Sequence, residues 1–238
     1  MIRLIKKIWE NKWIFRSIFT SIFFNFHYLP INQAIKLPII LYKPKLRHCK
    51  GSITIEGNIK TGMIILGKNM VSIYPNSGII YDNHGGSIIF KGNCSIGNNS
   101  AISIGSHGSL ILGRNFIATT SLKVVSYHHI EFKDNTLCGW ECLFLDTDFH
   151  QPTSLKSENI DSKAYAPIII GDNNWFALKC TILKGTILSS NNIIAAHSLL
   201  NKDYSENSYC LLAGSPAKIK KTGIYRNPLN DKISYDEL

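Results

Sequence analysis

Residues 167–175, Pro167-Ile168-Ile169-Ile170-Gly171-Asp172-Asn173-Asn174-Trp175, decide the fold of this chain. Aliphatic residues lead into a Gly-Asp-Asn turn, and the unit returns as Leu188-Ser189-Ser190-Asn191, with its asparagine 18 positions further on. Eighteen residues make three six-residue units. In such a unit one aliphatic side chain points into a narrow core, and Gly or Asn takes the left-handed corner conformation. The spacing therefore predicts short strands joined by tight corners, with three units to each coil.

The same pattern of apolar residue, turn and asparagine recurs along the chain. Its other copies are residues 66–69, 90–93, 96–99, 112–115 and 132–135. No single coil can bury its apolar face, so stacking of coils makes the core, and β-branched Ile suits this geometry. The pattern predicts an all-β protein, a parallel β-helix of hexapeptide repeats. An antiparallel β-sandwich is the alternative, but it does not explain why asparagine returns so regularly.

Composition and charge limit the classes of partner. The chain has 238 residues, a hydrophobic content of 45% and a net charge of +10. Residues 1–50 hold ten Lys and Arg against Glu10 alone, whereas the other 188 residues carry 16 basic and 15 acidic side chains. A protein that holds nucleic acid along its body would spread this charge over its binding face, so we expect no nucleic-acid partner. The six cysteines form no CxxC pair and predict free, reduced thiols, which favours a cytoplasmic protein.

Residues 1–26 are expected to form a basic amphipathic helix, because apolar residues recur there at roughly helical spacing. The richest apolar run, residues 13–24, has 12 residues, whereas a membrane span needs about 20. Two compatible interpretations remain open. The helix lies on an anionic membrane surface, or it packs as a cap on the end of the repeat body. Residues 43–47 are expected to be an extended linker into that body.

The chain is therefore expected to have three parts. Residues 1–50 form the helical segment with its linker, residues 51–222 form the β-helix, and residues 223–238 form a C-terminal extension. The longest polar excursion in the body, residues 151–166, is expected to leave the coil as a loop and to wall a site beside His150.

His150 is the candidate general base. It ends the stretch Asp146-Thr147-Asp148-Phe149-His150, and imidazole titrates near neutral pH. Alternate residues of an extended strand face one side, so Asp146, Asp148 and His150 would share a face if no corner intervenes. Either carboxylate could then orient the imidazole and stabilise its cation.

Residues 139–150 resemble the active-site coil of sugar O-acetyltransferases in the hexapeptide-repeat acyltransferase family. Residues 213–218 resemble the closing Gly-x-Pro-Ala-Lys turn of that family, and the whole resemblance covers roughly residues 52–222. It implies a left-handed β-helix, a homotrimer with sites between neighbours, and acetyl-CoA as co-substrate. It also implies His150 as general base for direct transfer, with no covalent acyl-enzyme. The sequence itself favours Asp148 as the catalytic partner of His150, with Asp146 as the alternative.

The family resemblance further implies acetylation of a saccharide or lipid-linked saccharide hydroxyl in the biosynthesis of capsule, O-antigen or exopolysaccharide. On the acceptor side, the candidates from the sequence are Asp146, Trp140 and either His128 or His129, which would line the acceptor pocket. On the cofactor side the resemblance assigns an aromatic residue, small residues that let the pantetheine approach, and a polar and basic cluster suited to the CoA phosphates. These cofactor residues are Trp175, Ala177, Ala196, Asn201, Lys202, Lys218 and Lys221.

Several alternatives remain open. An N-acyltransferase acting on an amino sugar would use the same residues, and a catalytically inactive β-helix scaffold would keep the repeats. Cys142 as a nucleophile is disfavoured because its acidic neighbours raise its pKa. A metal at His128, His129 and His150 is not expected, because adjacent residues of a strand point to opposite faces. We expect a cytoplasmic protein that is peripheral on the inner face of the cytoplasmic membrane.

Overall fold

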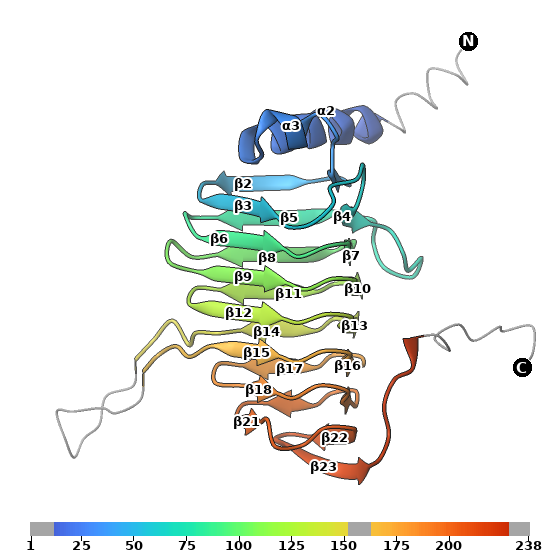
Figure 1. Ribbon diagram of the computed structural model, residues 1–238, viewed down its shortest axis with the longest axis vertical. Helices are drawn as coiled ribbons and strands as arrows, with labels where there is room; N and C mark the ends of the chain where they lie inside the picture. Colours follow the sequence, from blue (N-terminus) through green and yellow to red (C-terminus); the bar gives the residue numbers. More distant parts are fainter. Residues whose placement is uncertain (1–11, 152–162, 229–238) are drawn as a thin grey trace, which may run out of the picture.

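The computed structural model describes residues 12–151 and 163–228. It is a column of stacked coils, with two helices, α2 (Lys12–Tyr28) and α3 (Ile31–Ala34), over its N-terminal end (Figure 1). Each coil contributes strands to three sheets, and every strand pairing inside the column is parallel. Only the last strand, β23, pairs antiparallel. The predicted parallel β-helix is confirmed.

The three sheets form the sides of a prism. The first sheet contains, in order, β1 (Ile39–Leu41), β4 (Ile64–Lys68), β7 (Cys94–Gly97), β10 (Phe116–Thr120), β13 (Leu137–Trp140), β16 (Trp175–Phe176), β19 (Ile193–Ile194), β22 (Cys210–Gly214) and β23 (Ala217–Thr222). The second contains β2 (Lys45–Cys49), β5 (Ile79–Asn83), β8 (Ser100–Ile104), β11 (Lys123–Ser126), β14 (Leu143–Leu145), β17 (Thr181–Leu183) and β20 (Leu199–Leu200). The third contains β3 (Ser52–Ile55), β6 (Ser87–Phe90), β9 (Ser109–Leu112), β12 (His129–Phe132), β15 (Ile168–Ile170), β18 (Ile187–Leu188) and β21 (Asp203–Tyr204).

The register between coils reproduces the repeat length. Trp175 lies beside Ile193, and Ile193 lies beside Leu211, so each of these coils advances by 18 residues. Ile117 lies beside Leu137, a step of 20 residues, in a coil with a larger corner. Side chains alternate between the interior and the outer face along each strand, as the pleat requires.

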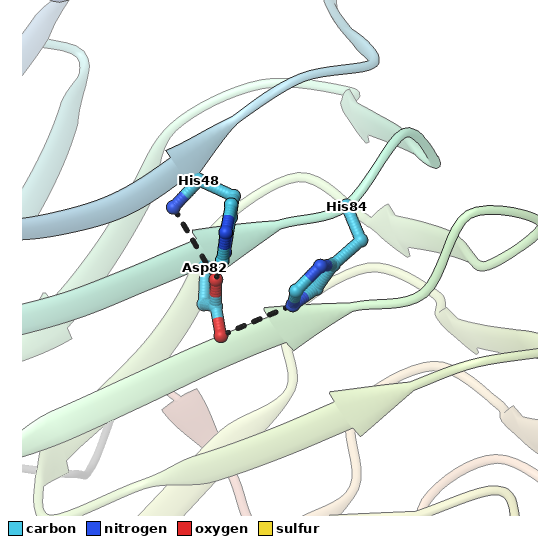
Figure 2. Close-up of side chains that lie close together, drawn as sticks. All are labelled: His48, Asp82 and His84. Carbon is cyan, nitrogen blue, oxygen red and sulfur yellow. Dashed lines mark hydrogen bonds and ion pairs between the residues drawn. The ribbon is translucent and has the colours of Figure 1, made fainter.

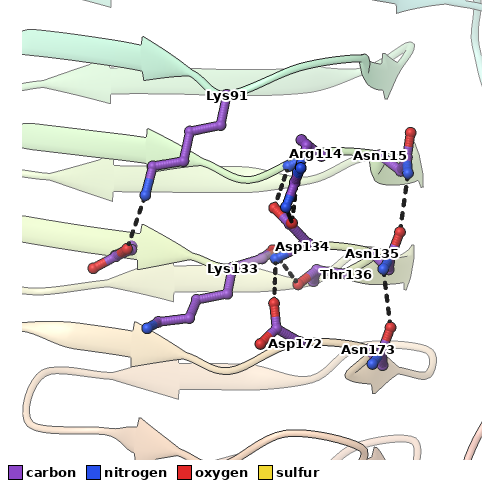
Figure 3. A network of polar contacts seen from close by, with 10 residues as sticks. Lys91, Arg114, Asn115, Lys133, Asp134, Asn135, Thr136, Asp172 and Asn173 are labelled. Atoms are coloured by element: carbon purple, nitrogen blue, oxygen red, sulfur yellow. Dashed lines mark hydrogen bonds and ion pairs between the residues drawn. The ribbon is translucent and has the colours of Figure 1, made fainter. Parts of the chain in front are cut away.

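The corner asparagines stack into a ladder along one edge of the prism (Figure 3). Asn115, Asn135, Asn173 and Asn191 all have left-handed backbones, with φ of 58°, 60°, 56° and 64°. The side-chain amide of each of the first three donates to the carbonyl oxygen of the next, at 3.0, 3.0 and 3.1 Å. Asn tolerates this conformation better than most residues with a Cβ, which explains why it returns at this corner.

The interior is filled by apolar side chains from all three sheets, including a column of phenylalanines. Phe116, Phe132, Phe144 and Phe176 are fully buried and stack edge to face, with ring centroids 4.8, 4.7 and 5.2 Å apart. This arrangement suits the charge distribution of aromatic rings. All six cysteines are free and five of them are buried, as predicted.

Helix α2 closes the first coil with polar side chains. The Asn25 amide nitrogen donates to the carbonyl of Ile39 at 2.7 Å, and its oxygen accepts from the N–H of the same residue at 3.1 Å. The Ser21 hydroxyl accepts from the N–H of Leu41 at 2.9 Å. These bonds replace the strand that β1 lacks on its outer edge, so α2 is a cap. Across residues 12–151 and 163–228, no helix combines the length and apolarity needed to cross a bilayer.

The β-helix begins earlier than predicted. Strand β1 starts at Ile39, and the expected linker at residues 43–47 runs into β2 at Lys45. These segments lack the asparagine repeat. They nevertheless join the first coil, because side chains of α2 form hydrogen bonds with their backbone. The helix expected at residues 1–26 is present from Lys12, and residues 1–11 lie outside the described part of the chain.

Replacing Asn25 by Leu should lower the free energy of unfolding by about 2–6 kcal/mol, because two buried peptide groups lose their partner at about 1–3 kcal/mol each. Chemical denaturation followed by circular dichroism measures this. Phe19 on the same helix is 70% exposed, and Phe19→Ala should cost less than about 0.5 kcal/mol. Equal losses in the two variants would contradict the capping role of Asn25.

Candidate active site

The chain leaves the coil after β14 and returns at β15, at the corner between the second and third sheets (Figure 1). Thr147 and Tyr165 form an antiparallel bridge where the excursion begins and ends. The N–H of Asp148 donates to the carbonyl of Ala164 at 2.8 Å. These two short legs are the loop base, residues 146–150 and 163–166. The side chain of His150 is exposed at the end of the first leg.

Lys184, from the next coil, ties the two legs together. Its Nζ lies 3.0 Å from Asp148 Oδ2 and donates to the carbonyl of Lys163 at 2.6 Å. The loop predicted at residues 151–166 therefore departs where the sequence indicated, and residues 152–162 of it lie outside the described residues. The carboxylate of Asp148 is paired with an ammonium group and braces the loop base beside His150.

Asp146 has a different role from the one predicted. Its side chain has no exposed surface. Its carboxylate accepts from the N–H of Tyr127 at 2.8 Å, from the N–H of His128 at 2.9 Å and from the hydroxyl of Ser126 at 3.2 Å. These contacts join the corner of one coil to the corner of the coil before it. A side chain without exposed surface cannot contact an acceptor, so Asp146 is a positioning residue for the His128 corner.

The shared face expected for Asp146, Asp148 and His150 does not form. Strand β14 ends at Leu145, and Phe149 has a left-handed φ of 58°. Strand alternation therefore stops before these residues. The sequence analysis made the shared face depend on the absence of a corner, and the structure places a corner there.

Aromatic side chains surround the loop base. Tyr127 packs edge-on against Phe149, with ring centroids 4.9 Å apart, and His128 lies 4.7 Å from the ring of Tyr165. We call Tyr127, His128, Phe149 and Tyr165 the aromatic wall. Sequence reasoning found His128 but missed the other three. For Phe149 and Tyr165 the signal was available, because they lie at the two ends of the polar excursion, whereas Tyr127 lies on the preceding coil.

His129 belongs to the outer face of the third sheet. It begins β12, and its Nε2 lies 3.9 Å from a carboxylate oxygen of Glu131. Glu131 in turn pairs with Lys91 at 3.4 Å. His128 lies at the corner before this strand, so the argument from strand alternation does not apply to the pair. Among the described residues, no group of three metal-ligating side chains includes His128, His129 or His150.

Trp140 lies at another corner, between the first and second sheets. It ends β13 and packs edge-on against Tyr74, with ring centroids 5.8 Å apart. The Tyr74 hydroxyl donates to Glu141 at 2.5 Å, and this bond raises the pKa of Tyr74 to about 12. Lys179 lies 3.7 Å from the same carboxylate. Within one chain, Trp140 and His150 are therefore on different edges of the prism.

Five of the seven predicted cofactor residues lie at the C-terminal end of the first sheet or its corner. Trp175 is 36% exposed and starts β16, and Ala177 directly follows that strand. Ala196 follows β19 on the next coil and is exposed. Lys218 and Lys221 are on β23, at the end of the same sheet.

Asn201 and Lys202 are on the edge that carries His150. They follow β20 at the corner between the second and third sheets, and Lys202 Nζ lies 5.4 Å from the ring centre of Tyr204. A single chain thus carries the candidate base His150 and the candidate cofactor residue Trp175 on separate parts of its surface.

Cys142 is not placed for nucleophilic chemistry. Its side chain has no exposed surface. A hydrogen bond with the thiol of Cys180, together with burial, raises the pKa of Cys142. A buried neutral thiol is a poor nucleophile, in agreement with the low weight given to the covalent scheme.

The sequence of this chain is similar to those of known acetyltransferases. No model of a known protein family matches it. The putative lipopolysaccharide biosynthesis O-acetyl transferase WbbJ of Escherichia coli (strain K12) is 26% identical over 172 residues, which are 72% of this chain and 78% of that protein. Galactoside O-acetyltransferase of the same strain is 30% identical over 115 residues, which are 48% of this chain and 55% of that protein.

The fold has a counterpart among solved structures. The polySia-specific acetyltransferase NeuO superposes with a TM-score of 0.55 at 20% identity, covering 82% of this chain and 76% of that one. The chain is a relative of the hexapeptide-repeat acetyltransferases. The predicted left-handed β-helix is confirmed by this match, and the kinship places the chain among acyltransferase enzymes.

Asp146→Asn should lower the free energy of unfolding by about 1–3 kcal/mol, because an amide NH₂ would face backbone N–H donors in a buried site. Asp148→Asn is the matched control. It removes a partly exposed ion pair and should cost at most about 1 kcal/mol. Chemical denaturation of both variants measures the difference, and similar costs for the two would refute the structural assignment of Asp146.

Proposed function

We propose that this protein transfers the acetyl group of acetyl-CoA to a saccharide hydroxyl during the biosynthesis of a surface polysaccharide. The observation that carries the proposal is the position of His150, exposed at the loop base beside the aromatic wall. Aromatic faces with a few polar groups are typical linings of ligand sites. The names of the E. coli relatives, a lipopolysaccharide-linked and a galactoside O-acetyltransferase, support a sugar acceptor.

His150 acts as the general base of a direct transfer. Its imidazole takes the proton of the acceptor hydroxyl while the oxygen attacks the acetyl carbonyl carbon, so that a C–O bond forms and the C–S bond breaks. The imidazolium then returns the proton to the departing sulfur of CoA. An imidazole can accept a proton at one nitrogen and return it, so it is suited to both steps.

Asp148 and Lys184 support this chemistry from the loop base. Their ion pair, with its second bond to the Lys163 carbonyl, holds the first leg of the loop against the second. The position of His150 depends on that leg. Asp148 is therefore a positioning residue that acts through the loop base, and it keeps the predicted catalytic role only in this indirect form.

The cofactor residues fit a thioester that approaches along the first sheet. Trp175 offers an exposed aromatic face, Ala177 and Ala196 leave room beside the backbone, and Lys218 and Lys221 supply positive charge for phosphates. His150 lies at the corner between the other two sheets. A homotrimer of prisms would bring the His150 edge of one chain to the first sheet of its neighbour and complete the site.

Release of CoA should depend on acetyl-CoA and a saccharide acceptor, and His150→Ala should lower it by about a hundredfold or more through loss of the base. A thiol-reactive dye follows release over a panel of neutral sugars, amino sugars and oligosaccharides. His107→Ala, an exposed histidine of another corner, is the control and should keep full activity. Release with amino sugars alone would establish N-acylation instead. No release, together with no acetyl-CoA binding, would favour the scaffold.

A shared site allows the same assay to test the trimer. Chains carrying His150→Ala and chains carrying Trp175→Ala should each have low activity, but co-expression should restore part of it, because some mixed trimers contain one intact site. Failure to restore activity in mixed assemblies would refute a site built from two chains.

We also propose that the N-terminal cap contacts an anionic membrane, which places the enzyme on the inner face of the cytoplasmic membrane near a lipid-linked acceptor. The outward face of α2 and α3 is apolar, with exposed side chains at Ile18, Phe19, Ile22, Phe23, Phe26, Ile31 and Ile35. From residue 11 to residue 55 the chain has seven basic residues and no acidic one. Apolar side chains flanked by positive charge match an anionic bilayer surface.

Binding to vesicles that contain phosphatidylglycerol should be lost when Phe19 and Phe23 are both replaced by Ser, since both side chains are exposed and neither makes a hydrogen bond that holds the cap. Flotation of the full chain with such vesicles measures this, and high salt should weaken the native binding by screening. Ile73→Ser removes an equally exposed apolar side chain elsewhere and should bind normally. Native-level flotation of the double variant would exclude this contact.

A further inference from the structure

Three side chains of metal-ligating type converge on the outer surface of the first two coils (Figure 2). His48 Nδ1 lies 2.8 Å from one carboxylate oxygen of Asp82, and His84 Nε2 lies 3.3 Å from the other. The two imidazole rings are 4.3 Å apart. One ligand atom from each residue can be chosen so that all three lie within 4.8 Å of one another. Within the described part of the chain this is the only such group.

A β-bulge brings His48 into the cluster. In the pairing of β2 with β5, Leu46 lies beside Tyr81 and Cys49 lies beside Asn83, so two residues of β2 face Asp82 alone. Such an extra residue re-aims the side chains of the bulged strand. The N–H of His48 also donates to Asp82 at 3.3 Å, which fixes the carboxylate from the same strand.

A clamped corner holds His84. The buried side chain of Asn83 accepts from the N–H of Gly85 at 3.0 Å and donates to the carbonyl of Gly86 at 3.2 Å. The N–H of His84 donates to the carbonyl of Ile104 on the next coil at 2.9 Å. The backbone on both sides of His84 is therefore tied down. Outer-shell bonds of this kind orient the ligands of protein metal sites.

The cluster is unlike an ordinary surface ion pair. Two histidines direct nitrogen atoms at one carboxylate, so protonation of both rings would place two positive charges close together. A single divalent cation satisfies both nitrogens in their neutral form and the carboxylate in its ionised form. Imidazole with carboxylate is a ligand set that suits Zn²⁺, Ni²⁺ and Cu²⁺, whereas Ca²⁺ and Mg²⁺ prefer oxygen alone.

We propose that His48, Asp82 and His84 form a binding site for a divalent transition metal ion, with zinc as the best-suited occupant and water at the remaining position. Bond lengths near 2.0–2.1 Å to zinc place neighbouring ligand atoms of a tetrahedron about 3.3 Å apart. The two contacts to Asp82, at 2.8 and 3.3 Å, are already close to this spacing. Small side-chain rotations would admit the ion.

The metal would act as a structural clip at the capped end of the prism. It would cross-link β2 of the first coil to β5 of the second. Strand β2 also holds the cap, because His27 bonds to the carbonyl of Cys49 at 2.7 Å and Tyr28 donates to that of Lys50 at 3.1 Å. A ligand that binds only the folded state stabilises it by mass action. The site is remote in the fold from the loop base, so this inference does not depend on the proposed acetyl transfer.

Isothermal titration of tag-free, chelator-treated full chain with Zn²⁺ alone tests the proposal. We expect one ion per chain, with affinity reduced at least about tenfold by His48→Ala, His84→Ala or Asp82→Asn. Circular dichroism would confirm that each variant is folded. His107→Ala is the matched control, since it removes an exposed histidine of the neighbouring corner and should leave binding unchanged.

Thermal unfolding provides a second readout. Zn²⁺ should raise the midpoint temperature of unfolding of the native chain and of the His107→Ala variant, but not that of the His84→Ala variant. The absence of zinc binding by the native chain would overturn the proposal. So would binding that persists unchanged in the three cluster variants, because the ion would then be held by other residues.

Discussion

The hydrogen bonds between successive coils are the constraint on which the rest of this structure depends. On the flat sides of the prism, each peptide finds its partner one coil away in a parallel ladder. At the corners that ladder is interrupted, and at the end coils it has no continuation. Side chains complete it, because a buried peptide without a partner is costly. Asn25 does so at the first coil, and Asp146 does so at a corner.

The same device recurs on the edge shown in Figure 3. The carboxylate of Asp134 accepts from the N–H of Arg114 at 2.7 Å, and that of Asp172 accepts from the N–H of Asp134 at 2.9 Å. The carboxylates at these corners therefore serve as hydrogen-bond acceptors for backbone N–H groups of the preceding coil. Asp134 also pairs with the side chain of Arg114 at 2.6 Å, whereas the carboxylate of Asp148 pairs with Lys184 at the loop base, beside His150.

The three edges of the prism are not equivalent. From the third coil onward, two of them repeat one left-handed residue in each coil, whereas residues 56–63 and 69–78 form longer corners on these edges in the first two coils. One carries the asparagine ladder, and the other carries Asn99, Ser121, Glu141, Lys179 and His197. The edge between the second and third sheets has no such repeated residue, and its corners vary in length. The loop base, the aromatic wall and the His48 cluster all lie on this edge, where the coil tolerates insertions.

The coil length and the corner asparagines could be predicted from sequence because both rest on local sterics repeated at a fixed spacing. His150 could be singled out because its carboxylate neighbours are adjacent in sequence. The separate roles of Asp146 and Asp148 could not, since strand alternation says nothing beyond Leu145. The cap and the bulge at His48 depend on partners 14 and 34 positions away, and no local pattern records such pairings.

The two ends of the column determine how copies of this protein can meet. An open β-helix would present unpaired strands at both ends, and each would be a template for another chain to extend the column into a fibre. Here α2 covers one end, and the other end is the reversed, lysine-bearing β23 (Figure 1). The first sheet is therefore closed at both ends, which opposes lengthwise polymerisation and favours the flat sides and edges as surfaces for ordered assembly.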